Sequence, residues 1–300
     1  MVKISICYNL LGSVLSAILF RVKCNRIRSI LRSLNEHTRD RLKLNIIFTI
    51  LFVIHLVCIS FFMYGSLSMM VNKNQNPLGV SVKTYFWWSS SESQVYDTFL
   101  WIFMILESLS KTHWIQIFAF VYTFIAILIE LNKMSCLEKY LKLSVINETT
   151  LKNLAIDVIR FRNLKTQFED TFNVFPWLWW SYWFIGWSGT IQYTQANTST
   201  PIHQLIAFTA QSSIQFGLTI LFNFIKNHYI GKCQSVCQKM ADNLMIKSVV
   251  VGKSDLIMSV RQELLIANYY TALGLFPLDN TLLLTFSSAV ISFTVMCLNL

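Results

Sequence analysis

Six long apolar runs dominate this 300-residue chain, and their length constrains the fold more than any other feature. A helix rises 1.5 Å per residue, so about 20 apolar residues cross a hydrocarbon core roughly 30 Å thick. The first run, with about 17 residues, lies at the lower limit for a span. We therefore predict an all-α, polytopic helical membrane protein with a single transmembrane domain over residues 1–300. The approximate spans are 4–20, 44–71, 98–132, 171–193, 204–225 and 281–300.

The composition favours the same fold class. Hydrophobic residues make up 54% of the chain, charged residues 13%, and the mean hydropathy is +0.49. Soluble domains contain about 25% charged residues, roughly twice this share. The runs do not alternate between apolar and polar residues, so they do not have the pattern of a transmembrane β-barrel. The net charge of +10 does not indicate nucleic-acid binding, because the basic residues lie between the apolar runs.

The distribution of Lys and Arg predicts the orientation of the spans. Segments 21–43, 133–170 and 226–280 hold eight, seven and six basic residues, whereas 72–97 holds two and 194–203 none. Basic loops remain in the cytoplasm during membrane insertion. We therefore expect the three basic segments to be cytoplasmic and both termini, including the C-terminus, to be extracellular.

Two of the basic segments also contain helical patterns. Apolar residues recur at three- and four-residue steps in 151–170 (Leu154, Val158, Phe161, Leu164) and in 255–270 (Ile257, Val260, Leu264, Ala267). These patterns predict cytoplasmic helical extensions, the first running on into the 171–193 span. The helices either pack into an intracellular bundle or join subunits, or they lie solvated beneath the membrane.

The closing run is unusual because it ends with the chain. Asp279 or Asn280 can cap the helix that follows, and residues 281–300 contain no charged side chain. Small residues (Ser287, Ser288, Ala289, Ser292) interrupt the large apolar ones. We expect a final spanning helix, and a last helix placed in this way could line a pore.

Two regions are candidates for a ligand site near the outer face. Glu107, Lys111, His113 and Trp114 share the 98–132 run, as part of either a ligand vestibule or a wet helical extension. In the aromatic run that begins at Phe175, Trp180, Trp183 and Trp187 fall on one helical stripe. Aromatic walls suit small-molecule pockets, but Trp residues also anchor helices at the bilayer interface.

The chain carries no recognisable catalytic, cofactor or metal-binding motif, so we expect no enzyme and no cofactor. Cys233 and Cys237 lie one helical turn apart and are expected to be reduced thiols, although a metal pair is an alternative. Of the two glycosylation sequons, Asn147 lies in a predicted cytoplasmic segment and should stay bare. Asn197 lies in a predicted outer loop, where it could carry a glycan.

The C-terminus resembles that of the insect gustatory receptors and the gustatory-receptor-like proteins of other animals. That family ends with a Thr-Tyr pair, five variable residues and a Gln-Phe pair. The matching positions here are Ser292 and Phe293, then Thr294 to Leu298, then Asn299 and Leu300. All four signature residues are replaced by chemically similar ones at unchanged spacing. The run Ala272 to Asp279 is similar to the family's common sequence before the last span.

The resemblance implies a seven-span receptor, here without the first span, in the plasma membrane. It implies a ligand-gated, non-selective cation channel of four like or unlike subunits, opened by a small-molecule tastant that binds from the outer side. The last helices would surround the pore, with Asn299 and Leu300 at its outer constriction as a gate. A secondary transporter and a divergent membrane protein without channel activity are the alternatives.

Overall fold

The computed structural model describes residues 2–34, 119–176, 178–181, 202–247, 254–266, 270–272 and 276–298, with short stretches between 46 and 60. Helices dominate these residues. They are α1 (Val2–Leu34), a helix over Ala119–Leu141 that we name the central helix, α5 (Glu148–Phe172), α7 (Ile202–Lys247), α8 (Ser254–Leu265) and α9 (Asn280–Leu298). Two short antiparallel strands, β1 (Thr271–Ala272) and β2 (Phe276–Pro277), pair between α8 and α9.

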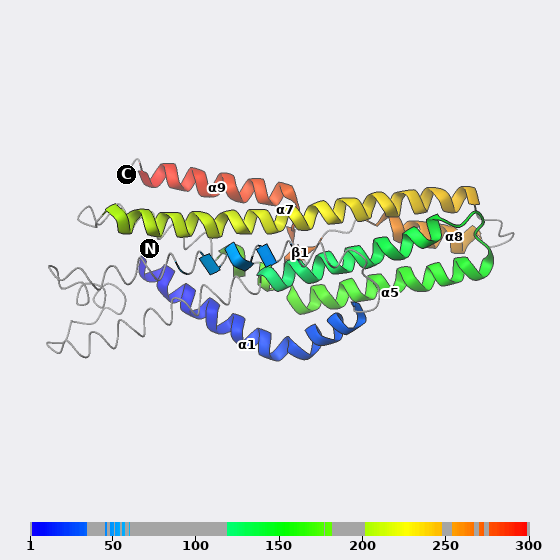
Figure 1. Cartoon of the computed structure of the whole chain (residues 1–300), viewed down its shortest axis with the longest axis horizontal. Helices are drawn as coiled ribbons and strands as arrows, with labels where there is room; N and C mark the ends of the chain where they lie inside the picture. Colours follow the sequence, from blue (N-terminus) through cyan, green and yellow to red (C-terminus); the bar gives the residue numbers. More distant parts are fainter. Residues whose placement is uncertain are drawn as a thin grey trace.

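The helices form an elongated bundle built around α7 (Figure 1). This helix runs along almost the whole length of the molecule, with α9 beside its N-terminal half and α8 beside its C-terminal half. The two chain termini lie at the same end of the bundle, and α8 lies at the opposite end. The hairpin of β1 and β2 lies near the middle of the bundle, between α8 and α9 in the chain.

Among the described residues, one helix has both the length and the composition of a membrane span. It is the central helix, whose apolar stretch is largely buried inside the bundle. A shorter apolar stretch occupies Asn280–Phe293 of α9. The predicted spans 44–71 and 98–132 lie mostly or partly outside the described residues, so the division into six spans stays a prediction.

The two basic segments with helical patterns form helices that pack into a bundle. In α5 the predicted Leu154, Val158 and Leu164 are buried, while Phe161 is half-buried. In α8 the predicted Ile257, Val260 and Leu264 are buried, whereas Ala267 lies outside the described residues. Leu154 and Val158 of α5 and the three residues of α8 share a core with the C-terminal half of α7, including Cys233, Cys237, Met240 and Leu244. Leu164 belongs to the neighbouring core around the central helix. The structure thus favours the bundle over solvated helices.

Nearby residues explain where α5 begins and where it ends. At its start, Asn147 Oδ1 accepts hydrogen bonds from the Thr150 backbone N (2.9 Å) and the Thr150 Oγ1 (2.7 Å). At its end, α5 stops at Phe172 instead of running on into the predicted 171–193 span. Pro176 explains this difference, because it has no N–H to donate to the Phe172 carbonyl four residues before it. Helical bonding resumes with Leu178 N donating to Val174 O.

The core where α5, α7 and α8 meet gives a direct test of the bundle. Leu264 is 2% exposed and its neighbour Leu265 is 42% exposed. Replacing a buried Leu with Ala costs about 2–5 kcal/mol because it leaves a cavity. We expect Leu264→Ala to lower the melting temperature of the detergent-solubilised protein clearly, and Leu265→Ala to change it little. Equal losses in the two variants would show that α8 does not pack as described.

Candidate functional site

The candidate pore helix α9 carries no charged side chain and is only partly covered by the other described residues. It packs beside α7 (Figure 1), and its side chains at Leu284, Ile291, Val295 and Met296 are at least 50% exposed. Of the family signature positions, Ser292 is exposed and Phe293 is half-buried. Asn299 and Leu300 lie outside the described residues. The described residues leave this apolar face open, and an exposed apolar face of this kind is typical of contact with lipid or another polypeptide segment.

A buried lysine of α7 holds the start of α9. Lys226 is 1% exposed, and its Nζ donates to Leu278 O and to Asn223 Oδ1, each at 3.2 Å. The same ammonium group lies 5.6 Å from the centre of the Tyr122 ring on the central helix. A buried ammonium is costly unless it is paired and hydrogen-bonded. These contacts therefore fix where the chain turns from β2 into α9.

Asp279 adds a second attachment at the same point. Its Oδ1 accepts a hydrogen bond from Leu282 N at 2.8 Å and so caps α9, as predicted for Asp279 or Asn280. Its negative charge also acts on the ammonium group of Lys226. One residue further on, Asn280 Oδ1 accepts a hydrogen bond from Asn227 Nδ2 at 2.8 Å. The first turn of α9 is thus bound to two consecutive residues of α7.

Tyr270 connects this region to the central helix. Its buried hydroxyl lies 2.9 Å from Glu130 Oε1 and 3.3 Å from Ala126 O, and its backbone O accepts a hydrogen bond from Leu278 N at 2.7 Å. Burial and the neighbouring Glu130 raise the pKa of the Tyr270 phenol well above its ordinary value, so the hydroxyl remains a neutral donor. We name the set Glu130, Asn223, Lys226, Tyr270, Leu278 and Asp279 the junction.

Beside the junction, α5 contributes two groups of opposite charge. Lys165 Nζ lies 5.2 Å from the centre of the Tyr270 ring. Burial lowers the pKa of Lys165 and raises the pKa of Glu169, and their mutual attraction opposes both shifts. With Glu130 and Lys133 they line a small cavity of about 180 Å³. On the side that faces α5, the junction therefore lies next to charges of both signs, from Lys165 and Glu169.

One of the predicted aromatic ligand-pocket residues falls in the described part. Trp180 is buried, and its ring meets that of Phe286 on α9 edge to face, with centroids 4.6 Å apart. Neither Trp180 nor Trp179 has a hydrogen-bond partner for its indole N–H among the described residues. Trp180 thus packs the aromatic run against α9. Its role in a ligand pocket stays a prediction.

The other residues of the predicted outer sites, namely His113, Trp114, Trp183, Trp187 and Asn197, lie outside the described residues. Cys233 and Cys237 are buried free thiols. Within the described part of the chain, no group of three or more His, Cys, Asp or Glu residues gathers around them. The structure therefore offers this pair no further metal ligands in the part that it describes.

The sequence reasoning missed the junction. Glu130 is a lone acid close to the end of an apolar run, and Lys226 directly follows another. An ionisable residue at such a position usually has a partner inside the protein, and this signal could have identified both. It could not have identified Tyr270 or the Leu278 carbonyl as the partners, because these lie 140 and 52 residues away.

Substitutions at Asp279 separate its two roles at the junction. Asp279→Asn keeps an N-cap acceptor but removes the charge near Lys226, whereas Asp279→Ala removes both. Loss of a cap costs about 1 kcal/mol. We expect the melting temperature to fall in both variants and further in Asp279→Ala. An Asn variant as stable as the unaltered protein would show that the charge contributes nothing.

No protein-family model and no curated protein sequence matches the chain. Solved structures do match. The insect olfactory receptor OR5 from Machilis hrabei superposes with a TM-score of 0.62 at 12% identity, covering 97% of this chain and 79% of the receptor. The same receptor in complex with eugenol superposes with a TM-score of 0.68 at 14% identity, covering 99% and 81%.

A likeness at this level of identity concerns the fold. It confirms the predicted fold class, an all-α polytopic helical membrane protein. The matched structures are olfactory receptors, and membership of the gustatory family stays a prediction from the C-terminal residues. The chain has the helical fold of an insect olfactory receptor.

Proposed function

We propose that this protein is a chemoreceptor subunit of a ligand-gated, non-selective cation channel in the plasma membrane. The observation that carries the proposal is the match of nearly the whole chain, α9 included, to an insect olfactory receptor that has been solved with a small molecule bound. Four like or unlike subunits would place their α9 helices around a central pore. The ligand would be a small-molecule tastant, as the gustatory-type C-terminus implies.

The exposed face of α9 supports this arrangement. Its apolar side chains Leu284, Ile291 and Val295 are exposed. They can therefore contact neighbouring subunits as well as lipid. Ser287, Ser288 and Ser292 lie on the same helix and would supply small polar groups along a pore. In this arrangement Asn299 and Leu300 form the outer gate. The Leu300 side chains of the subunits would meet around the axis and close the pore by excluding water.

The junction gives this channel a mechanical connection between its bundle and its pore helix. Lys226, Asp279 and Tyr270 attach the start of α9 to α7 and to the central helix. A ligand that shifts the outer ends of these helices would therefore move α9 as well. The proposed ligand pocket includes His113, Trp114, Trp180, Trp183 and Trp187, and Trp180 already touches α9 through Phe286.

A secondary transporter is the second candidate function. The number and arrangement of subunits distinguish a transporter from a channel. In single-particle images of the protein in detergent or nanodiscs, we expect a fourfold particle with the C-terminal ends of the α9 helices near its axis. Monomers, or dimers with α9 at the periphery, would contradict a channel of this type. A fourfold particle without ligand-evoked current would point to the divergent form that lacks channel activity.

The gate can be tested at Asn299. Asn299→Ala removes the amide that would line the outer constriction, so we expect altered ion permeation or gating with unchanged surface expression. Currents evoked from a panel of small molecules in transfected cells provide the measurement. Asn153→Ala, at an exposed position of α5, is the matched control and should leave the currents unaltered. Identical currents in the unaltered protein and in Asn299→Ala would reject the pore assignment.

A further inference from the structure

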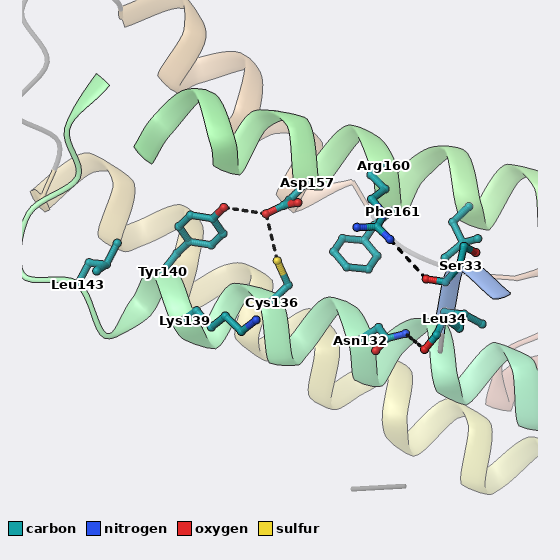
Figure 2. A pocket seen from close by; sticks show the side chains of 11 residues that line it. Ser33, Leu34, Asn132, Cys136, Lys139, Tyr140, Leu143, Asp157, Arg160 and Phe161 are labelled. Atoms are coloured by element: carbon teal, nitrogen blue, oxygen red, sulfur yellow. Dashed lines mark hydrogen bonds between the residues drawn. The ribbon is translucent and has the colours of Figure 1, made fainter. Parts of the chain in front are cut away.

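A second cavity lies in the bundle, apart from α9 and the junction (Figure 2). Its volume is about 380 Å³, and it opens between the end of α1, the C-terminal half of the central helix, and α5. All three walls belong to segments whose charges predict a cytoplasmic position. The cavity is therefore separate from the proposed ligand pocket near the outer face.

The cavity has apolar walls and a polar side. Leu34, Leu143, Phe161 and Leu164 contribute its carbon surface. Asn132 fixes the end of α1 at one edge, since its Nδ2 donates to Leu34 O at 3.2 Å. The Asn132 Oδ1 is buried and has no partner among the described residues, so the wall retains an acceptor for a water or a ligand hydroxyl.

The single carboxylate in the lining is already engaged. Asp157 Oδ2 accepts a hydrogen bond from Tyr140 Oη at 2.7 Å and from Cys136 Sγ at 3.3 Å, and Figure 2 shows both donors turned toward it. These two donors take about half of the roughly four acceptor sites of a carboxylate. Asp157 is thus partly engaged by residues of the lining itself.

The two cations in the lining are not engaged in this way. Lys139 and Arg160 form no ion pair with any carboxylate of the described residues, and both are exposed toward solvent. The Arg160 guanidinium reaches only the Ser33 carbonyl, at 3.4 Å, which leaves other N–H donors available. Exposed Arg28 and Arg32 on α1 add positive charge on the same segment. The cavity thus combines an apolar interior with an unpaired cationic rim.

We propose that this cavity binds an amphipathic phosphate, with its alkyl chain among Leu34, Phe161 and Leu164 and its phosphate at Lys139 and Arg160. A guanidinium group matches phosphate geometry through paired N–H donors, and a lysine adds a point charge. A volume of about 380 Å³ is within the usual range for small-ligand sites. The phosphate could belong to an inner-leaflet lipid or to a soluble metabolite, and both share this chemistry.

Binding of radiolabelled octyl phosphate to the full chain in phosphatidylcholine nanodiscs tests the proposal, with empty nanodiscs as background. We expect saturable binding, and an apparent dissociation constant at least about tenfold higher in the Lys139→Gln/Arg160→Gln variant, because it loses charge-assisted hydrogen bonds. The Lys142→Gln/Lys152→Gln variant removes the same charge from exposed positions outside the cavity and should bind as the unaltered protein does.

Two further experiments test where the phosphate comes from and whether binding takes place in the cavity. If the natural occupant is a lipid, phosphatidic acid in the nanodisc will compete with octyl phosphate. If it is a soluble phosphate, this lipid will not compete. Ser33→Trp, at an exposed position of the rim, should fill the entrance and abolish binding while both cations are still present. Absence of saturable binding, or equal loss in both charge variants, would overturn the proposal. The readout requires no current, so its outcome is independent of channel activity.

Discussion

The structure depends on a buried ammonium group at the point where the chain enters its last helix. A charged Lys226 inside the protein needs acceptors, which the Leu278 carbonyl and Asn223 supply, and Asp279 adds a negative charge nearby. These groups come from α7 and from the turn between β2 and α9. The requirement to compensate one charge thus helps to fix the start of α9 against α7, beside which α9 then runs.

The rest of the bundle makes that fixed point rigid. Tyr270 ties the same turn to Glu130 on the central helix, and the aromatic rings of Phe168 and Phe172 pack around it and Tyr122. At the far end, α5, α7 and α8 share an apolar core. A displacement of one helix is therefore transmitted to the others, because a close-packed interior yields very little. This is the property that a receptor needs if a ligand at one end is to move a gate.

The cavity between α1, the central helix and α5 is a second feature of the bundle, and we proposed it as a binding site for a phosphate. Asn132 and Arg160 hold the end of α1 against the other two walls, through the carbonyls of Leu34 and Ser33. The lone carboxylate of the cavity accepts hydrogen bonds from Tyr140 and Cys136, whereas Lys139 and Arg160 are exposed and offer N–H donors to an incoming phosphate. An anion bound at this site would act on the packing between α1 and α5.

Local physics made several features readable from the sequence. The period of Leu154, Val158 and Leu164, and that of Ile257, Val260 and Leu264, fixed the buried faces of α5 and α8. Asp279 before an apolar run indicated the cap of α9. The end of α5 was missed although its signal, Pro176, lies in the sequence, because the apolar pattern on both sides concealed the interruption.

Residue order alone was enough to predict long apolar helices, the residues of α5 and α8 that face a core, and the start of α9. These features follow from interactions over three or four residues. The contact of Tyr270 with Glu130, the hydrogen bond from Lys226 to Leu278, and the cavity that Lys139 and Arg160 share with the end of α1 became visible once the helices were packed together. Such contacts join residues far apart in the chain, and the packing of whole helices selects among many alternatives of similar local energy.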